Sequence, residues 1–528
     1  MLRHLLRHVR LAPLLLLPLT TGLSLAGPDP EKQITASAIP LYSEASEHSV
    51  VPVRVELNNP TGKDAVIDLT IEDTWNSSNS QIYSFSVPQG KTVNTVIYPY
   101  VSKGPWIRWS HDNTTDSLSV SSVSGTGDMA ILQTGTPSAW NTVTGITTRL
   151  NVMDWPADYR TYAARSVMVM PEQDYSTHLD EPHRKAIRQW VLGGGRLILV
   201  GDKGRAISAE PLGRGVILHA PSLKDLSDEA VKGVMKKLHD RIPVNRSYPQ
   251  MPNSQSYFQS TPSILISVIL LAFAVLVGPV SLFVLAPAGK RQRLFILIPS
   301  ISLGFSLLLA VVILSLDGTG GTGVRNVHIM VNPEDHTGII SQTQVCKTSV
   351  LLNNTFTLPE NTYLNGSLIT RDSRTAEGYE KRPLENTARH GEECSGGWFT
   401  SKATVQHRLM RPISTRAAVT VTSSGPDGVP VLQSTFPAAL TELTCRTPDG
   451  AYWKVDRLPP GSQMAAVPST PPKTTFSMND QPLPPGHFQA RMDSADGEPG
   501  AIPTLESIDW KHTNITVSGP IAGQTQPR

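Results

Sequence analysis

Two long apolar runs lie in the middle of the chain, at 264–286 and 294–316, and neither contains a charged residue. At a rise of about 1.5 Å per residue, a helix of either length spans the roughly 30 Å hydrocarbon core of a bilayer. Pro279 and Pro299 would break a soluble helix but are tolerated in membranes, where neighbouring groups satisfy the freed carbonyls. We therefore predict a two-helix transmembrane hairpin, and not a buried helix pair of a soluble protein.

The first 26 residues have the pattern of an export signal. Three arginines precede a Leu-rich core, and Ser24 and Ala26 are the small residues that signal peptidase requires before the cut. Because Pro13 and Pro18 interrupt this core, it is short for a membrane span of about 20 residues. The pattern predicts cleavage after Ala26, in preference to an uncleaved anchor helix.

The connector at 287–293 carries Lys290, Arg291 and Arg293. Positive charges in short loops stay on the cytoplasmic side. The prediction is a multi-pass protein of the inner (plasma) membrane, whose bulk lies on the extracytoplasmic (periplasmic) side. The lipid bilayer is then a partner, and a cytoplasmic turn of this size is too small to bind a nucleotide.

Residues 30–105 alternate apolar and polar positions in four short segments: 51–57, 65–71, 82–87 and 93–100. Turn residues such as Asn, Pro and Gly separate these segments. Strands of period two with frequent turns are typical of an immunoglobulin-like β-sandwich. The chain lacks the cysteine pair of antibody domains, so the prediction concerns the architecture alone.

Residues 127–242 change to another pattern. Short apolar runs, which predict buried strands, surround a helical period at 176–192 that ends in three glycines; a second helix is predicted at 228–239. The predicted strands are 128–133, 149–153, 166–170, 196–200 and 216–219. Buried strands that alternate with helices favour a parallel α/β sheet of the flavodoxin or amidotransferase type.

The motifs that run from Trp155-Pro156-Ala157-Asp158-Tyr159 to Gly194-Gly195-Arg196-Leu197-Ile198 resemble a glutamine-amidotransferase-like domain. This domain occurs in certain uncharacterised bacterial membrane proteins, where it follows an exported β-sandwich and precedes a membrane hairpin. The resemblance covers about residues 30–320 and implies a layout of domains, not an activity.

An amidotransferase needs a cysteine nucleophile at a strand end. The predicted strand ends carry none, because Cys346, Cys394 and Cys445 all follow the hairpin. Asp154, Asp174 and Asp202 lie near strand ends, where open α/β sheets bind ligands, although aspartates also cap helices and turns there. They are the candidate ligand-binding residues; no catalytic or metal-binding motif and no cofactor are predicted.

The region after the hairpin is predicted as a β-rich exported domain at 324–460 and a Pro-rich, partly disordered tail at 461–528. Gly318–Gly323 fits G-x-G-x-x-G, but it follows a membrane helix, so a flexible linker is predicted and not a dinucleotide site. An oxidising space outside the membrane favours one disulfide among the three cysteines, whose pairing the sequence leaves open.

Composition narrows the class of protein. The 528 residues include 46 basic and 44 acidic ones, and this balance excludes a nucleic-acid binder that depends on a large basic surface. The leading hypothesis is a non-catalytic envelope membrane protein that presents exported binding domains. The alternatives are an envelope hydrolase that uses the crevice carboxylates, and an accessory subunit of a transporter or other membrane complex.

Overall fold

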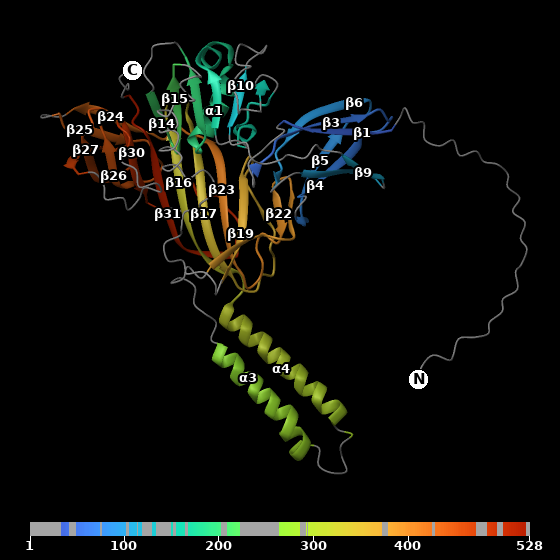
Figure 1. The fold of residues 1–528 in the computed structure, drawn as a ribbon. Coiled ribbons are helices and arrows are strands. Elements are labelled where there is room, and N and C mark those ends of the chain that lie inside the picture. The colour runs from blue at the N-terminus through green and yellow to red at the C-terminus, as the bar shows by residue number, and fades with distance from the viewer. Residues whose placement is uncertain are drawn as a thin grey trace, which may run out of the picture.

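The computed structural model describes most of the chain after residue 32, and β-strands in several sheets predominate there (Figure 1). The signal peptide predicted at 1–26 with Ala26, the turn residues Lys290, Arg291 and Arg293, and the helix predicted at 228–239 lie outside the described residues. The described residues are 33–41, 49–73, 76–101, 105–112, 114–118, 129–133, 149–151, 155–163, 167–201, 208–221, 263–285, 292, 294–371, 379–424, 428–470, 483–493 and 500–523.

Two antiparallel sheets pack together at the N-terminal end of the described chain. The first contains β1 (Thr35–Pro40), β3 (Val53–Asn59) and β6 (Lys91–Ile97), and β2 (Ser49–Val50) pairs separately with β7 (Tyr100–Val101). The second contains β4 (Ala65–Asp73), β5 (Asn76–Val87), β8 (Pro105–His111) and β9 (Thr114–Leu118). Alternate residues of both sheets, including Val55 and Leu69, share one buried core, as the period-two pattern predicts.

The second sheet continues into strands that come from the far end of the chain. These are β21 (Thr387–His390), β22 (Glu393–Gly396) and β18 (Phe356–Thr357). β21 pairs in parallel with β5, and Asn79 holds the junction through two hydrogen bonds. Its Nδ2 donates to the Leu384 carbonyl (2.8 Å), and its Oδ1 accepts from the Thr387 amide (3.1 Å). The sheet of the predicted module at 30–105 therefore extends past residue 105 into β8 and β9 and also includes β21, β22 and β18 from the C-terminal region.

We expect Asn79→Ala to loosen this junction. The substitution leaves a backbone donor and a backbone acceptor without their partner, at a cost of about 1–3 kcal/mol. Hydrogen exchange of the β21–β22 amides should accelerate in this variant. Asn58→Ala removes a bond to exposed Thr92 within the sandwich and should leave these amides unchanged. Equal protection in the two variants would contradict the prediction.

Five parallel strands form the sheet of the next domain, in the spatial order β11-β10-β12-β13-β15. Chain order 2-1-3-4-5 is the order of flavodoxin-like sheets. An antiparallel strand, β14 (Ser208–Leu212), adds to the edge beside β15. The parallel strands are β10 (Met129–Gln133), β11 (Arg149–Asn151), β12 (Val167–Pro171), β13 (Arg196–Val200) and β15 (Gly215–Ala220).

Helix α1 (Glu181–Leu192) covers one face of this parallel sheet, where Ile187 and Trp190 share a core with Met170 and Leu199. It begins later than the predicted residue 176. The Asp180 side chain caps it by accepting from the His183 amide (3.0 Å), and Pro follows within its first turn. The residues before this cap form a π-helical turn, η5 (Asp174–His178), and a 3-10 turn, η4 (Tyr159–Thr161), precedes β12.

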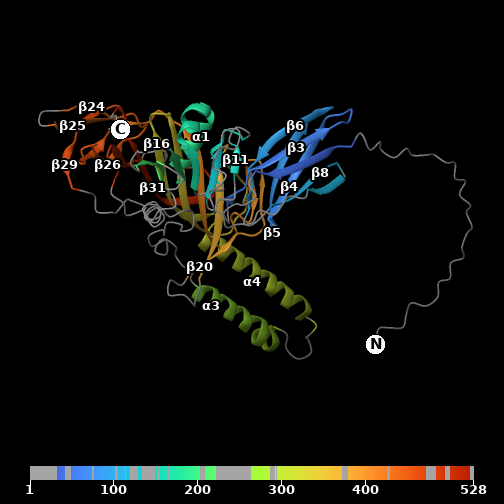
Figure 2. The ribbon, with the colours of Figure 1, turned by 45° about the horizontal axis from the view of Figure 1, so that its top comes forward.

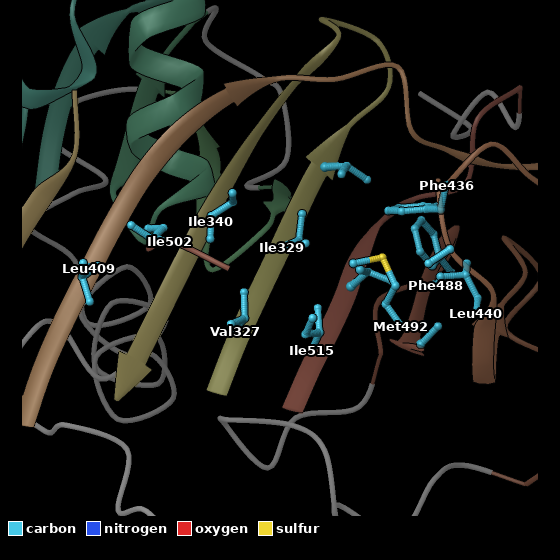
Figure 3. Close-up of a cluster of buried hydrophobic side chains, with 14 of the residues drawn as sticks. Val327, Ile329, Ile340, Leu409, Phe436, Leu440, Phe488, Met492, Ile502 and Ile515 are labelled. Carbon is cyan, nitrogen blue, oxygen red and sulfur yellow. The ribbon is translucent and has the colours of Figure 1, made fainter. Parts of the chain in front are cut away.

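A ten-stranded sheet forms the body of the C-terminal region. Many of its buried side chains belong to the hydrophobic core shown in Figure 3. A smaller sheet contains β24 (Val419–Ser424), β25 (Pro430–Ser434) and β28 (Gln463–Ala465). The large sheet contains, in spatial order, β20 (Tyr379–Pro383), β19 (Tyr363–Arg371), β23 (Thr404–Ser414), β17 (Thr337–Thr348), β16 (Gly321–Asn332), β31 (Ile508–Pro520), β30 (His487–Met492), β26 (Leu440–Arg446), β27 (Tyr452–Leu458) and β29 (Val467–Ser469).

Two predictions for this region are wrong. β30 and β31 belong to the predicted tail at 461–528, yet β31 lies between β16 and β30 in the middle of the large sheet. Ile515 and Val517 of β31 are buried in the sheet's core. The predicted linker also fails in its second half, because Gly321–Gly323 begin β16 and pair with both β17 and β31. The physical reason is the parallel pairing of β16 with β31, which places the end of the predicted linker and part of the predicted tail in the same sheet.

The domains form one body, because α1 packs on the large sheet. Arg188 of α1 donates to Asp335 Oδ1 (2.6 Å) at the turn between β16 and β17, and Asn332 donates to the other oxygen of the same carboxylate (2.8 Å). Met330 and Ile339 of the large sheet belong to the same hydrophobic core as α1. Both views show α1 beside the large sheet, where it contacts β17 (Figures 1 and 2).

A buried polar network holds the 500–505 segment against β17. Gln342 donates to the Ile502 carbonyl (2.9 Å) and accepts from the Ile502 amide (2.8 Å). Its amide also donates to Gln344, which contacts His407 Nδ1 (3.4 Å), while His407 Nε2 lies 2.8 Å from the Trp398 carbonyl. His407 is fully buried, and burial lowers its pKa to about 4.

The depressed pKa of His407 predicts acid sensitivity. An unfolded His takes up a proton near pH 6.5, whereas the native side chain does so only near pH 4. Stability from this group is therefore complete above pH 6.5 and falls by up to about 3 kcal/mol as the pH decreases to 4. Urea unfolding at several pH values should show this loss, with a smaller pH slope in His407→Gln. An identical slope in the two proteins would contradict it.

Two apolar helices project from the β domains and lie side by side (Figure 1). α3 (Ser263–Val275) continues into the π-helix η8 (Leu276–Leu285), and α4 (Leu294–Asp317) runs back beside them. The rings of Phe273 and Phe305 lie 5.3 Å apart. Among the described helices, only α4, over Leu294–Val312, is long and apolar enough to cross a membrane, and none of that stretch is buried. Ser267–Phe283 is a shorter apolar helix.

Candidate functional site

The structure describes the surroundings of one of the three candidate aspartates. Asp154 and Asp202 lie outside the described residues. Asp174 begins the π-helical turn after β12, where its Oδ1 lies 3.2 Å from Nδ1 of His178. The structure therefore places Asp174 near a carboxyl end of the parallel sheet, paired with a neighbour on its own turn.

A second carboxylate–imidazole pair lies at the same edge. Glu172 directly follows β12, and its Oε1 is 3.2 Å from Nδ1 of His219 on β15. The Glu172 side chain reaches β15 by crossing over Gly201, the residue after β13. A Cβ at Gly201 would lie 2.1 Å from Glu172 Oε2, so only a glycine leaves room for this arrangement. Both side chains are partly buried, with 28% of Glu172 and 17% of His219 exposed.

This pair lies where parallel sheets bind ligands. In the order 2-1-3-4-5 the crossover connections reverse direction between β10 and β12, and Glu172 follows β12 beside that point, but its side chain extends the other way, over the end of β13 to His219 on β15. A carboxylate beside an imidazole can orient a ligand or exchange a proton with it. Sequence reasoning missed Glu172 and His219 because it considered aspartates alone. Their position at strand ends is the signal that could have identified them.

A cleft of about 230 Å³ opens where three parts of the chain meet. β5 and β6 of the sandwich form one wall, Arg160 of the α/β domain forms another, and the C-terminal region closes it. The residues that the argument below uses are Tyr83, Tyr98, Arg160, Asn361 and Arg389. No residue of this cleft was among the sequence-predicted candidates, because the cleft combines residues more than 300 positions apart.

Arg160 lines this cleft and makes several contacts there. Its guanidinium donates to Asp158 (2.6 Å to Oδ2) and to Asn361 Oδ1 (2.7 Å), and it lies 4.2 Å from the centre of the Tyr98 ring. Asp158 caps the short turn that carries Arg160, since it also accepts from the Arg160 amide (2.8 Å). The stacking on Tyr98 joins the α/β domain to the sandwich, and the hydrogen bond to Asn361 joins it to the C-terminal region, while the Asp158 ion pair orients Arg160 within its own turn.

The tyrosines of the cleft present protonated hydroxyl groups. Burial raises the pKa of Tyr83, despite opposing effects of Arg389 and Arg160, and burial also raises the pKa of Tyr98. The Tyr98 hydroxyl bonds Thr161 (3.0 Å), and Arg389 donates to the carbonyls of Gly391 (2.9 Å) and Thr362 (3.2 Å). Rings, hydroxyls and guanidinium groups together make this cleft suitable for binding a polar ligand with an apolar face.

The cysteines do not form the predicted disulfide. Cys346, Cys394 and Cys445 are all free and buried, on separate strands of the C-terminal region. Burial raises the pKa of Cys394 to about 11 and that of Cys445 to about 12, and it raises the pKa of Cys346 as well. These thiols are therefore poor nucleophiles in the folded protein. No group of three or more potential metal ligands occurs among the described residues.

Comparisons with known proteins add little to this picture. No protein-family model and no curated protein match the chain. A yeast delta-COP-I mu-homology domain, complexed with a Dsl1 WxWxV peptide, shows 10% identity over 38% of this chain and 95% of that one, with a TM-score of 0.19. A Paenibacillus sp. cycloisomaltooligosaccharide glucanotransferase, complexed with cycloisomaltoheptaose, shows 8% identity over 71% and 69%, with a TM-score of 0.18. These TM-scores establish no shared fold.

Proposed function

We propose that this protein is a non-catalytic membrane protein that holds three joined domains at one face of the bilayer, as binding surfaces of the cell envelope. The observation that carries the proposal is α4, whose stretch Leu294–Val312 is apolar, long enough to span and entirely unburied by the rest of the chain. An exposed apolar helix of this length is unstable in water and stable in lipid.

The pairing of α4 with α3–η8 supports a hairpin with both β-rich ends on the same side. The short basic connector, with Lys290, Arg291 and Arg293, favours a cytoplasmic turn and extracytoplasmic domains. In this proposal the sandwich is immunoglobulin-like, and the α/β domain is an amidotransferase-like fold that lacks the nucleophile and serves in binding.

Topology reporters test this arrangement. Alkaline phosphatase fused after Arg528 should be active in cells, because the enzyme folds only outside the cytoplasm. The matched phosphatase fusion after Arg293, at the end of the connector, keeps the three basic residues and should be inactive, whereas a fluorescent protein fused at the same position should fluoresce in the cytoplasm. Activity in the opposite pattern would place the domains in the cytoplasm, and a chain released by alkaline carbonate would refute the anchor.

A second candidate function is an envelope hydrolase, and the pair Glu172–His219 is the observation that favours it. Here the carboxylate and imidazole, at 3.2 Å, would act as acid and base on a ligand at the sheet edge. Glu172→Gln and His219→Asn should then each abolish hydrolysis of the substrate by the full chain and leave its melting temperature unchanged. His178→Asn, which alters the more exposed pair, is the matched control.

A further inference from the structure

The end of the large sheet nearest the apolar helices carries an unusually exposed leucine. Leu352 follows β17 and is 82% exposed, whereas most other leucines whose burial is described in the β domains are buried or half-buried. Figure 1 shows that the helices project from this end of the sheet, where β17 ends and β16 begins. α4 ends at Asp317 and β16 begins at Gly321, so only three residues separate the helix from the sheet.

Backbone hydrogen bonds fix the Leu352 loop beside the exit of α4. The Ser349 amide donates to the Gly320 carbonyl (2.7 Å), and the Gly320 amide donates to the Val350 carbonyl (3.0 Å). These bonds tie the loop to the residues that leave α4, within three positions of Leu352. These bonds therefore hold the start of the loop next to the residues that follow α4.

A second hairpin supports the loop from the side. The Lys402 amide donates to the Ser349 carbonyl (3.0 Å), and the Leu351 amide donates to the Ser401 hydroxyl (3.1 Å). Lys402 is exposed at this tip, with a left-handed backbone (φ 59°) that turns the hairpin. The membrane-facing edge, defined as 349–353 with 400–402, thus combines an apolar side chain with an exposed ammonium group.

We propose that this edge contacts the lipid surface, with Leu352 inserted at the boundary between headgroups and acyl chains and Lys402 directed at lipid phosphates. The inference rests on the proposed membrane anchor. Apolar side chains enter this boundary, and lysine ammonium groups remain at the headgroup level. A second contact beside the helix pair limits the tilt of the β domains relative to the bilayer. It therefore fixes the distance from the bilayer to the Arg160 cleft and to the Glu172–His219 pair.

Spin labelling of the full chain in phosphatidylglycerol–phosphatidylethanolamine vesicles tests the contact. The native cysteines are buried, so a nitroxide attaches selectively to Leu352→Cys. We expect the label there to collide more with oxygen than with the water-soluble nickel complex NiEDDA. Ile39→Cys, on β1 and 62% exposed, is the matched control that should favour the nickel complex.

A third label separates the contact from the anchor. Leu307→Cys, on α4 and 60% exposed, should favour oxygen most strongly. If it does and Leu352→Cys behaves like Ile39→Cys, the lipid contact is wrong and the anchor stands. If Leu307→Cys also favours the nickel complex, the anchor itself is wrong. If the label at Leu352→Cys favours oxygen in vesicles and loses this preference when Lys402→Glu is added, both parts of the proposal are supported: insertion of Leu352 and attraction of Lys402 to lipid phosphates.

Discussion

The double variant Leu303→Arg/Leu307→Arg should fail to remain in the membrane. The two positions lie one turn apart near the middle of α4, and their side chains are 63% and 60% exposed. Each exchange of leucine for arginine at the centre of a membrane helix costs about 3–4 kcal/mol, so the pair costs about 7 kcal/mol. A cost of this size opposes insertion of α4, and the proposed hairpin then loses one of its two spans. The fraction of chain that resists alkaline carbonate should fall from nearly all to little.

The matched control is Leu303→Ala/Leu307→Ala, which shortens the same side chains without adding charge. This variant should remain resistant to carbonate, because alanine is tolerated in membrane helices. Complete retention of the arginine variant would show that α4 does not cross the bilayer. It would also remove the basis for the lipid contact at Leu352.

Phe399→Ala should cause the largest loss of stability in the β domains. Phe399 is 1% exposed, and its ring lies 5.3 Å from Phe356 and 4.6 Å from His407. Truncation of a buried phenylalanine costs about 3–5 kcal/mol, since the lost contacts add to the cost of a cavity. The urea midpoint of the C-terminal region should fall clearly in the detergent-solubilised chain.

The control for Phe399 is Trp106→Ala on β8. Trp106 is 54% exposed, so its truncation should change stability by no more than about 0.5 kcal/mol. A loss in Phe399→Ala that is no larger than in the control would contradict the packing around the β17–β23 network. The variant also disturbs the ring beside His407, so its pH slope should change together with its midpoint.

Within the described residues, local periodicity located several elements of the sandwich and of the α/β domain. β13 spans the predicted residues 196–200, and β4 begins at the predicted residue 65. The reason is that strand alternation and helical period record which face of a segment is buried, and this information resides within about ten residues. Helix α1 was predicted too early by about five residues, since Asp180 and the proline after it define the true start.

The partners of those elements were not predictable in the same way. The pairing of β31 with β16 and of β21 with β5 joins residues far apart in the chain, and nothing in the local pattern of either strand names its neighbour. A Pro-rich stretch between 458 and 485 therefore suggested a tail, while the strands after it complete the core. The cleft at Arg160 and the pair Glu172–His219 exist only because these long-range pairings bring their elements together.

The sequence by itself determined the apolar helices, the basic residues that lie between them and the position of many strands. Each of these depends on charge or hydrophobicity at consecutive positions. Only the tertiary structure decided that three domains share sheets and cores, that the cysteines stay apart, and that a leucine beside α4 faces outward. Each of these depends on which distant segments can bury surface against one another, and burial is a property of the whole chain.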